Sequence, residues 1–295
     1  MYKKSMKPDV LPFFDSLSNT FSYIVKDPES TSCAVLDSVL EFDIASGQIG
    51  YKGADKIISY IKQHQLQVVL LLETHVHADH LSAAPYIQNE VGGKIGISKH
   101  IVTIQEEFGK LFNAGTEFER DGSQFDVLFD SDDVYSIGKL QGVAMHTPGH
   151  TPACMTHLIG DAAFVGDTLF MPDGGTARAD FPGGDARLLY QSIKKVLTLP
   201  NDTRLYVCHD YQPNGRKLEF LTTVAEQKQK NIHVGNDVSE ESFVLMREAR
   251  DASLDMPGLI YPSLQVNMRA GHFPAAEDNK RHYLKVPISG LKGIG

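Results

Sequence analysis

The segment that most constrains this chain is a cluster of histidines and an aspartate directly behind an apolar run. Residues 68–72 are apolar throughout and predict a buried strand. Residues 74–80 then read Thr-His-Val-His-Ala-Asp-His, which places three imidazoles and one carboxylate within seven residues. Histidine nitrogens and carboxylate oxygens are ligands that Zn, Fe and Mn accept. We therefore expect a metal site at the end of this strand, built from His75, His77, Asp79 and His80.

Three later segments each place a ligand-type residue in a turn at the end of an apolar stretch. These residues are His150, Asp167 and His209. Gly149 and Gly166 directly precede the first two, and glycine lets the backbone approach closely enough for a ligand to point back toward a shared centre. We expect all three side chains to join the first cluster.

With these motifs in this order, the chain resembles the metallo-β-lactamase superfamily. Its members carry H-x-H-x-D-H, then a histidine, an aspartate and a further histidine, and the resemblance spans about residues 21–209. It implies an α/β (α+β) fold, a four-layer αβ/βα sandwich with the metal site in a shallow cleft at one edge of the two sheets. The superfamily includes glyoxalase II-type thiolester hydrolases, lactonases, nucleases, flavo-diiron proteins and persulfide dioxygenases. The shared motif alone therefore does not fix the reaction.

Finer motifs are similar to those of the persulfide dioxygenase (sulfur dioxygenase) family. That family carries T-H-x-H-A-D-H, P-G-H-T-P-G, G-R-T-D-F, H-D-Y and a C-terminal N-M-R. The matching segments here are residues 74–80, 148–153, 178–181, 209–211 and 267–269. This chain departs from the family at Ala179, where Thr is usual, and at Ala153, where the second glycine of P-G-H-T-P-G is usual. Neither position is a metal ligand by the resemblance, so the departures concern the substrate pocket.

The resemblance implies one Fe(II) per chain, held by His75, His150 and Asp167 as the catalytic metal site. Two histidines and one carboxylate leave positions open on the metal, as is typical of non-haem Fe(II) oxygenases. The implied reaction oxidises glutathione persulfide, or a related low-molecular-weight persulfide, with O2 to sulfite and thiol. His77, Asp79, His80 and His209 would then surround the iron site without binding the ion.

A dizinc hydrolase of the glyoxalase II or lactonase type would use the same residues differently. His75, His77 and His150 would hold one Zn(II), Asp79, His80 and His209 the other, and Asp167 would bridge them and help to activate water. Since every ligand for both sites is present, the residues alone leave both open. A third interpretation is a non-catalytic metal-binding protein, although no ligand position of the motifs is substituted.

An anionic substrate requires local cations in a chain with a net charge of -9. Guanidinium groups bind carboxylates through two hydrogen bonds, which favours Arg178 and Arg216 as substrate-binding residues. Tyr211, between these two in the chain, offers a hydroxyl or an aromatic wall.

The 295 residues, 42% of them hydrophobic, suffice for one large domain. We expect a catalytic domain over residues 1–253 and an arm over residues 254–295 packed on the same domain, because the composition shifts to Pro, Gly and Asn there. The negative net charge argues against nucleic acid as a partner, and no apolar run is long enough for a membrane span. Residues 1–15 lack the apolar core of a secretory signal, so a cytoplasmic location is expected. A homodimer is expected from base rates.

The three cysteines are widely spaced and predict neither a disulfide framework nor a zinc ribbon. Cys154 and Cys208 lie near presumed ligands, but their apolar surroundings favour buried, unreactive thiols.

Apolar periodicity and turn residues predict the remaining elements. Helices are expected over residues 54–65, 80–89, 101–112, 186–197, 222–231 and 239–252. Strands are expected over residues 21–25, 33–36, 68–72, 125–129, 134–137, 143–146, 155–159, 162–165 and 203–208. Asp185 is a candidate cap for the helix that follows it, and Ser239 begins a segment suited to a helix N-terminus.

Overall fold

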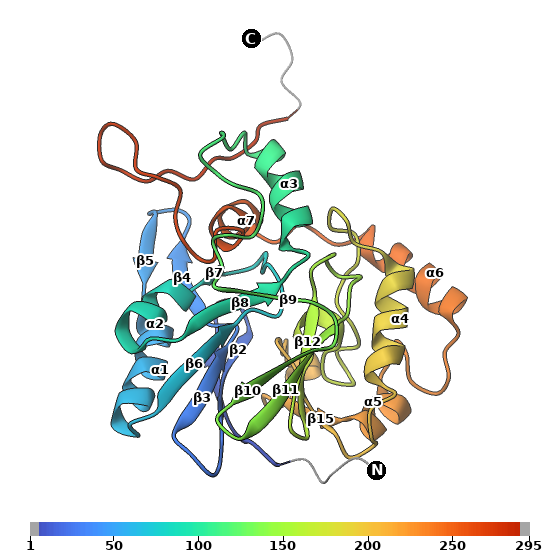
Figure 1. Cartoon of the computed structure of the whole chain (residues 1–295). Coiled ribbons are helices and arrows are strands. Elements are labelled where there is room, and N and C mark those ends of the chain that lie inside the picture. Colours follow the sequence, from blue (N-terminus) through green and yellow to red (C-terminus); the bar gives the residue numbers. More distant parts are fainter. Residues whose placement is uncertain (1–5, 290–295) are drawn as a thin grey trace.

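The computed structural model describes residues 6–289 and arranges them as two facing six-stranded β-sheets with helices on their outer sides, plus a smaller three-stranded sheet (Figure 1). The strands of the first half are β1 (Asp9–Asp15), β2 (Thr20–Lys26), β3 (Ser32–Leu36), β4 (Val39–Asp43), β5 (Gln48–Gly50), β6 (Gln67–Leu72), β7 (Leu81–Ser82), β8 (Lys94–Ser98) and β9 (Val127–Phe129). Those of the second half are β10 (Asp133–Ile137), β11 (Leu140–His146), β12 (Met155–Ile159), β13 (Ala162–Phe164), β14 (Arg204–Tyr206) and β15 (Leu221–Thr223).

Seven α-helices occur in the described part of the chain, together with short 3₁₀ turns at Gly166–Thr168 and Pro213–Gly215. The helices are α1 (Lys52–Gln63), α2 (Ala84–Val91), α3 (Ile101–Leu111), α4 (Ala186–Val196), α5 (Val224–Lys230), α6 (Glu240–Asp251) and α7 (Ile260–Asn267). In Figure 1, α1 and α2 cover the outer side of one sheet and α4 and α5 that of the other. This arrangement confirms the expected four-layer αβ/βα sandwich.

The first sheet has the order β1-β2-β3-β6-β8-β9, and the second runs from β10 to β15 in chain order. β3, β6, β8 and β9 are parallel, so β6 ends at the same edge of the sheet as its neighbours. In the second sheet β13 and β14 are parallel, and the remaining neighbours are antiparallel.

Alternating side chains of the strands fill separate cores, as the two-residue period of a strand requires. In β2, Phe21, Tyr23 and Val25 face the core between the sheets, whereas Ile24 faces the core under the helices. α1 buries Ala54, Ile57, Ile58 and Ile61 against the first sheet, as its sequence predicts. The second sheet packs against α4 and α6.

Two predicted helix starts are confirmed by their caps. Asp185 accepts a hydrogen bond from Leu188 N at 2.9 Å, and Ser239 accepts one from Ser242 N at 3.2 Å. The helix expected from His80 begins instead at Ala84, because Leu81 and Ser82 pair with β4 as strand β7. Pro85 lies in the first turn of α2, where its missing N–H costs no helical hydrogen bond.

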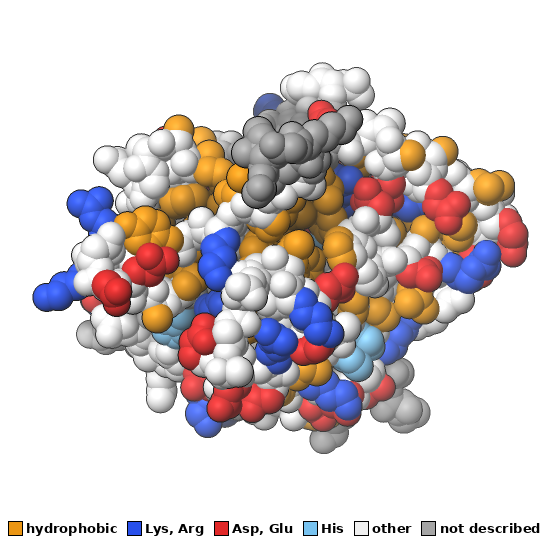
Figure 2. Space-filling model, turned by 90° about the horizontal axis from the view of Figure 1, so that it is seen from above, with side chains coloured by type: hydrophobic (Ala, Val, Ile, Leu, Met, Phe, Trp, Pro, Cys, Tyr) orange, Lys and Arg blue, Asp and Glu red, His pale blue; other side chains and the backbone are white. Residues whose placement is uncertain are grey.

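No helix within residues 6–289 is long and apolar enough to cross a bilayer. Figure 2 shows one face of the molecule, on which Lys and Arg side chains are interspersed with Asp and Glu side chains around hydrophobic areas. On this face the visible cations do not gather into one large basic patch.

Candidate metal centre

The predicted ligand residues meet where several strands end. His75 follows β6, His150 lies in the loop between β11 and β12, Asp167 lies in the 3₁₀ turn after β13, and His209 follows β14. Strand ends at one edge of a sandwich bring together side chains that are far apart in the sequence. All four side chains are buried.

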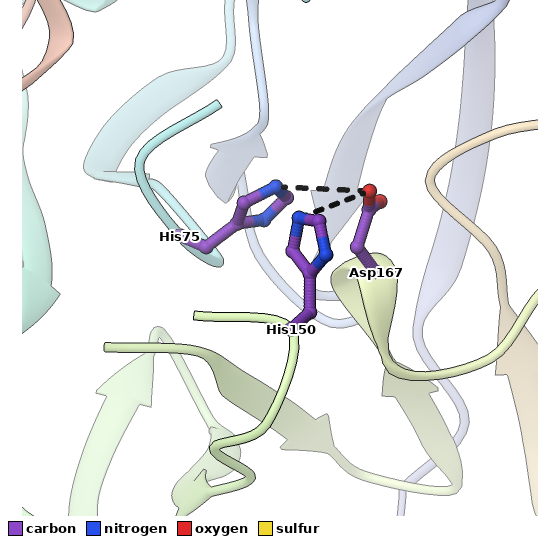
Figure 3. A group of neighbouring side chains, drawn as sticks. All are labelled: His75, His150 and Asp167. Atoms are coloured by element: carbon purple, nitrogen blue, oxygen red, sulfur yellow. Dashed lines mark ion pairs between the residues drawn. The ribbon is translucent and has the colours of Figure 1, made fainter. Parts of the chain in front are cut away.

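His75, His150 and Asp167 form the most direct three-ligand group. One ligand atom from each side chain lies within 4.8 Å of the other two. His75 Nε2 and His150 Nε2 are 3.9 and 3.6 Å from Asp167 Oδ2, and Figure 3 shows both rings directed toward that carboxylate. Two imidazole nitrogens and one carboxylate oxygen facing a common point fit a divalent metal ion.

The other ring nitrogen of each histidine is held by the protein. His150 Nδ1 donates to the carbonyl oxygen of Arg178 at 2.8 Å. His75 Nδ1 lies 3.0 Å from Thr74 Oγ1, and that hydroxyl donates to the Asp37 carboxylate. A donor bond at Nδ1 leaves the lone pair on Nε2 and fixes the ring orientation, which is the usual support for a metal-binding histidine.

The glycines before the ligands adopt backbone conformations that favour glycine. Gly149 has φ +137° and packs against the backbone of Leu189, at the start of α4. Gly166 has φ +50°, and a Cβ atom there would lie 2.7 Å from Thr74 Oγ1. The backbone therefore approaches its neighbours closely at both positions, as expected from the glycines that precede His150 and Asp167.

His77 faces two carboxylates behind the three-ligand group. Its Nε2 is 3.0 Å from Asp37 Oδ1 and 3.3 Å from Glu73 Oε2, and Glu73 also accepts from Ser82 Oγ at 2.5 Å. Burial lowers the pKa of His77, but Asp37 and Glu73 outweigh burial and hold it well above its ordinary value. The ligand atoms of His77 group with Asp79 and His80, or with Asp37 and Glu73.

His209 lies beside both aspartates of the site. Its Nε2 is 3.2 Å from Asp167 Oδ1 and 3.7 Å from Asp79 Oδ2. Burial lowers the pKa of His209, but the two carboxylates outweigh it and raise the value to about 9. Burial also raises the pKa of Asp167, yet His209, His75 and His150 hold it well below its ordinary value. The carboxylate is therefore ionised and able to serve as an anionic ligand.

Four buried polar atoms of the cluster have no hydrogen-bond partner among residues 6–289. They are Glu73 Oε2, His77 Nδ1, His80 Nε2 and Asp167 Oδ1. Burying such atoms without a partner is costly, and a bound cation is one way to satisfy them. The donor set therefore fits a metal, and it retains ligand atoms beyond the first three.

A cavity of about 290 Å³ gives access to the cluster. Its polar lining includes the candidate ligands His75, Asp79, His150, Asp167 and His209 together with Arg178, Arg247 and Arg250. Its apolar walls include Phe170, Phe181, Leu254 and Pro257, and Tyr211 also lines it.

The predicted substrate residues are placed differently from one another. Arg178 lines the cavity, but its guanidinium binds Asp180 through two hydrogen bonds at 2.6 and 2.7 Å. Arg216 is bound by Asp173 and Asp210 and is not among the residues that line the cavity. The third predicted residue, Tyr211, lines the cavity.

Ala153 and Ala179, the two departures from the persulfide dioxygenase motifs, are buried and do not line the metal cavity. Ala179 N donates to Asp251 Oδ2 at 2.8 Å. The three cysteines are free and buried, as expected, and burial raises the pKa of Cys154 to about 12.

Two supports of the site were not predicted. Asn267 of α7 donates from Nδ2 to the carbonyl oxygens of His77 and His80 at 2.9 and 2.8 Å, and its Oδ1 accepts from Ser82 N. The only sequence signal was the similarity of residues 267–269 to N-M-R, which assigned no role.

The second unpredicted support comes from α6. The buried Arg247 pairs with Asp251 at 2.6 Å and donates to Thr176 O at 3.1 Å. Asp251 in turn accepts from Ala179 N, so the pair holds the segment whose Arg178 carbonyl orients His150. The four-residue spacing of Arg247 and Asp251 on a helix predicts an ion pair, but it does not predict that the pair is buried.

Residues 16–209 match the family model of the metallo-beta-lactamase superfamily, and the chain belongs to this superfamily. The superfamily and the clustered His and Asp side chains define a metal-binding enzyme class.

Individual relatives carry different names. A Burkholderia pseudomallei protein named "probable metallo-hydrolase" is 55% identical over 95% of this chain and 98% of its own length. "Glyoxylase B2" of Dictyostelium discoideum is 46% identical over 97% of this chain and 98% of its own. The mitochondrial persulfide dioxygenase ETHE1 of Homo sapiens is 29% identical over 88% of this chain and 87% of its own.

Among solved structures, that of ETHE1 from Myxococcus xanthus is similar, with a TM-score of 0.71 and 28% identity. It matches 90% of this chain and 100% of its own. The persulfide dioxygenase name thus belongs to a more distant sequence relative than the hydrolase and glyoxylase names do.

Proposed function

We propose that this chain is an iron-dependent persulfide dioxygenase that oxidises glutathione persulfide, or a related low-molecular-weight persulfide. The observation that carries the proposal is the three-ligand group of His75, His150 and Asp167. Two histidines and one carboxylate with further positions free are typical of non-haem Fe(II) oxygenases.

The position of His77 supports a single ion. In a dinuclear hydrolase this side chain would share an ion with His75 and His150. Here the ligand atoms of His77 group with those of Asp79 and His80, or with those of Asp37 and Glu73, and not with those two histidines. Similarity to the human and Myxococcus ETHE1 proteins over most of the chain, together with the finer motifs, supports the same reaction.

A bound iron would supply the one-electron chemistry needed to activate dioxygen, which protein side chains lack. The overall reaction is GSSH + O2 + H2O → GSH + SO3²⁻ + 2 H⁺. The terminal sulfur is oxidised, dioxygen is reduced, and the S–S bond is broken with water supplying the third oxygen of sulfite.

The chain's own residues orient the reactants and limit water. Phe181 packs edge-on against His150 at 5.1 Å between ring centroids, and the Arg178 guanidinium lies 5.0 Å from the Phe181 ring. Phe170 packs against His209 and Tyr211 in the same way. These rings form apolar walls beside the candidate ligands, where a bound persulfide would be shielded from water and held in a fixed orientation.

An oxygen electrode tests the reaction on protein purified anaerobically. We expect about one iron per chain and one O2 consumed per glutathione persulfide, with sulfite and glutathione as products. The proposal is wrong if oxygen uptake by the wild type requires neither iron nor persulfide.

A dizinc thiolester hydrolase or lactonase is the second candidate, favoured by the unpartnered His77 Nδ1 and His80 Nε2 and by the names of the more similar relatives. It predicts two zinc ions per chain and hydrolysis of S-lactoylglutathione without oxygen uptake. If the iron-loaded protein consumes no oxygen and the zinc-loaded protein hydrolyses the thiolester, the hydrolase replaces the dioxygenase.

A further inference from the structure

We propose that Arg250, at the C-terminal end of α6, binds a carboxylate of the substrate's thiol carrier. The proposal rests on the proposed function and narrows its substrate class to persulfides of small, carboxylate-bearing thiols, of which glutathione is one. The sequence alone favours Arg178 and Arg216 for this role.

The arginines of the cavity differ in whether their charge is already used. Arg178 is bound by Asp180, and Arg247 by Asp251. Arg250 also lines the cavity, and within residues 6–289 its guanidinium has neither an ion pair nor a hydrogen bond. A substrate anion at Arg178 or Arg247 would compete with a carboxylate already in place, whereas Arg250 is available without such competition.

Arg250 is exposed, whereas Arg247, one turn earlier on the same helix, is buried. The helix is therefore anchored through Arg247 and Asp251, and Arg250 is held at the cavity by a fixed element. A cation on a rigid element binds an anion at a smaller entropic cost than one on a mobile loop.

The other lining groups divide the cavity by chemistry. His75, His150 and Asp167 form the metal end, and Leu254 and Pro257 add apolar surface close to Arg250 in the sequence. A complementary ligand carries a sulfur anion for the metal, an uncharged stretch for the apolar wall and a carboxylate for Arg250. Glutathione persulfide has these three parts, whereas the persulfide of mercaptoethanol lacks the carboxylate.

Binding of glutathione, the product thiol, tests the contact without turnover. We expect Arg250→Gln to weaken glutathione binding to the metal-loaded protein, measured by calorimetry, by about tenfold, equivalent to about 1.4 kcal/mol. Arg250→Lys should recover part of the loss. The diethyl ester of glutathione should bind the wild type and Arg250→Gln equally, because the charge that Arg250 recognises is gone.

Arg187→Gln is the matched control, since Arg187 is an exposed arginine on α4 that pairs with Glu240 and does not line this cavity. It should bind glutathione like the wild type. In turnover, Arg250→Gln should raise KM for glutathione persulfide about tenfold and leave kcat and the KM for mercaptoethanol persulfide nearly unchanged.

The outcomes separate this proposal from the function on which it rests. If the wild type oxidises persulfides and Arg250→Gln binds glutathione as the wild type does, the role of Arg250 is overturned and the dioxygenase stands. If no persulfide is oxidised but Arg250→Gln raises KM for S-lactoylglutathione about tenfold, the dioxygenase fails and Arg250 remains the carboxylate site. If the wild type does not bind glutathione, the proposal that Arg250 recognises a carboxylate of this thiol is overturned.

Discussion

At the scale of single residues, the histidines of the site differ in which ring nitrogen the protein holds. His75 and His150 each use Nδ1 for a protein hydrogen bond and direct Nε2 toward Asp167. His77 uses Nε2 for Asp37 instead, and its Nδ1 has no hydrogen-bond partner within residues 6–289. Identical side chains two positions apart thus turn different ring nitrogens toward the protein, and the metal content of variants tells how many ions the cluster holds.

Substitution of Asp167 and of His77 should therefore affect metal content unequally. Asp167→Ala removes the anionic ligand of the three-ligand group, so bound iron should be lost while circular dichroism shows the fold retained. His77→Gln should keep about one iron per chain, because the amide can still donate to Asp37 and an outer partner changes metal affinity by only about 10–100-fold. Iron is measured by plasma emission spectroscopy after anaerobic purification. Equal loss in both variants would favour the dinuclear site.

The meeting of the candidate ligand residues could be predicted from the sequence, because each lies in a short motif whose meaning is local. The substrate arginines could not, because the availability of a guanidinium depends on carboxylates placed by the fold. Arg216 lies between Asp173 and Asp210, and Asp173 is far from it in the chain. Arg250 carries no motif, and its importance follows only from its position on the cavity wall.

At the scale of elements, α7 connects the C-terminal region to the metal motif. Val266 and Met268 are fully buried in the core under the first sheet, and Asn267 between them binds the backbone of residues 77–82. The helix was not predicted because nearly all its residues are buried, so it lacks a polar face and the 3.6-residue period. Pro262, in its first turn, also reads as a helix breaker. β1 was likewise missed, although it pairs with the whole of β2.

Removing the side chain of Asn267 should loosen the metal motif. Asn267→Ala deletes hydrogen bonds to His77 O, His80 O and Ser82 N, so we expect about 10–100-fold weaker metal binding and faster amide exchange across residues 77–82. Gln265→Ala is the control, because this amide on the same helix is hydrogen bonded to Lys285 and Tyr261 and not to residues 77–82. If both variants weaken metal binding alike, α7 acts only through general stability.

At the scale of the whole molecule, stability depends on how the two sheets pack. His157 of β12 is fully buried at this interface, beside Phe129 of the other sheet, and its Nδ1 lies 2.9 Å from the hydroxyl of Tyr135. Its Nε2 is buried without a hydrogen-bond partner within residues 6–289. Burial lowers the pKa of His157 from 6.5 to about 4, so the folded protein keeps this ring neutral at mildly acidic pH.

The buried ring makes the free energy of unfolding depend on pH. Above pH 6.5 His157 is neutral in both states and contributes no slope; as pH falls toward 4 the unfolded chain gains a proton that the folded chain does not accept. Stability should fall over this window by up to about 3 kcal/mol from this residue alone.

His157→Gln keeps a polar contact for Tyr135 but cannot be protonated, so the stability of this variant should fall less steeply between pH 6.5 and 4. Urea unfolding at several pH values, with a chelator present so that metal binding does not contribute, measures both slopes. The wild type and His157→Gln share the other buried histidines, so their contribution to the pH dependence is the same in both. If the free energy of unfolding falls equally with pH in the two proteins, His157 is protonated in the folded state and the prediction is wrong.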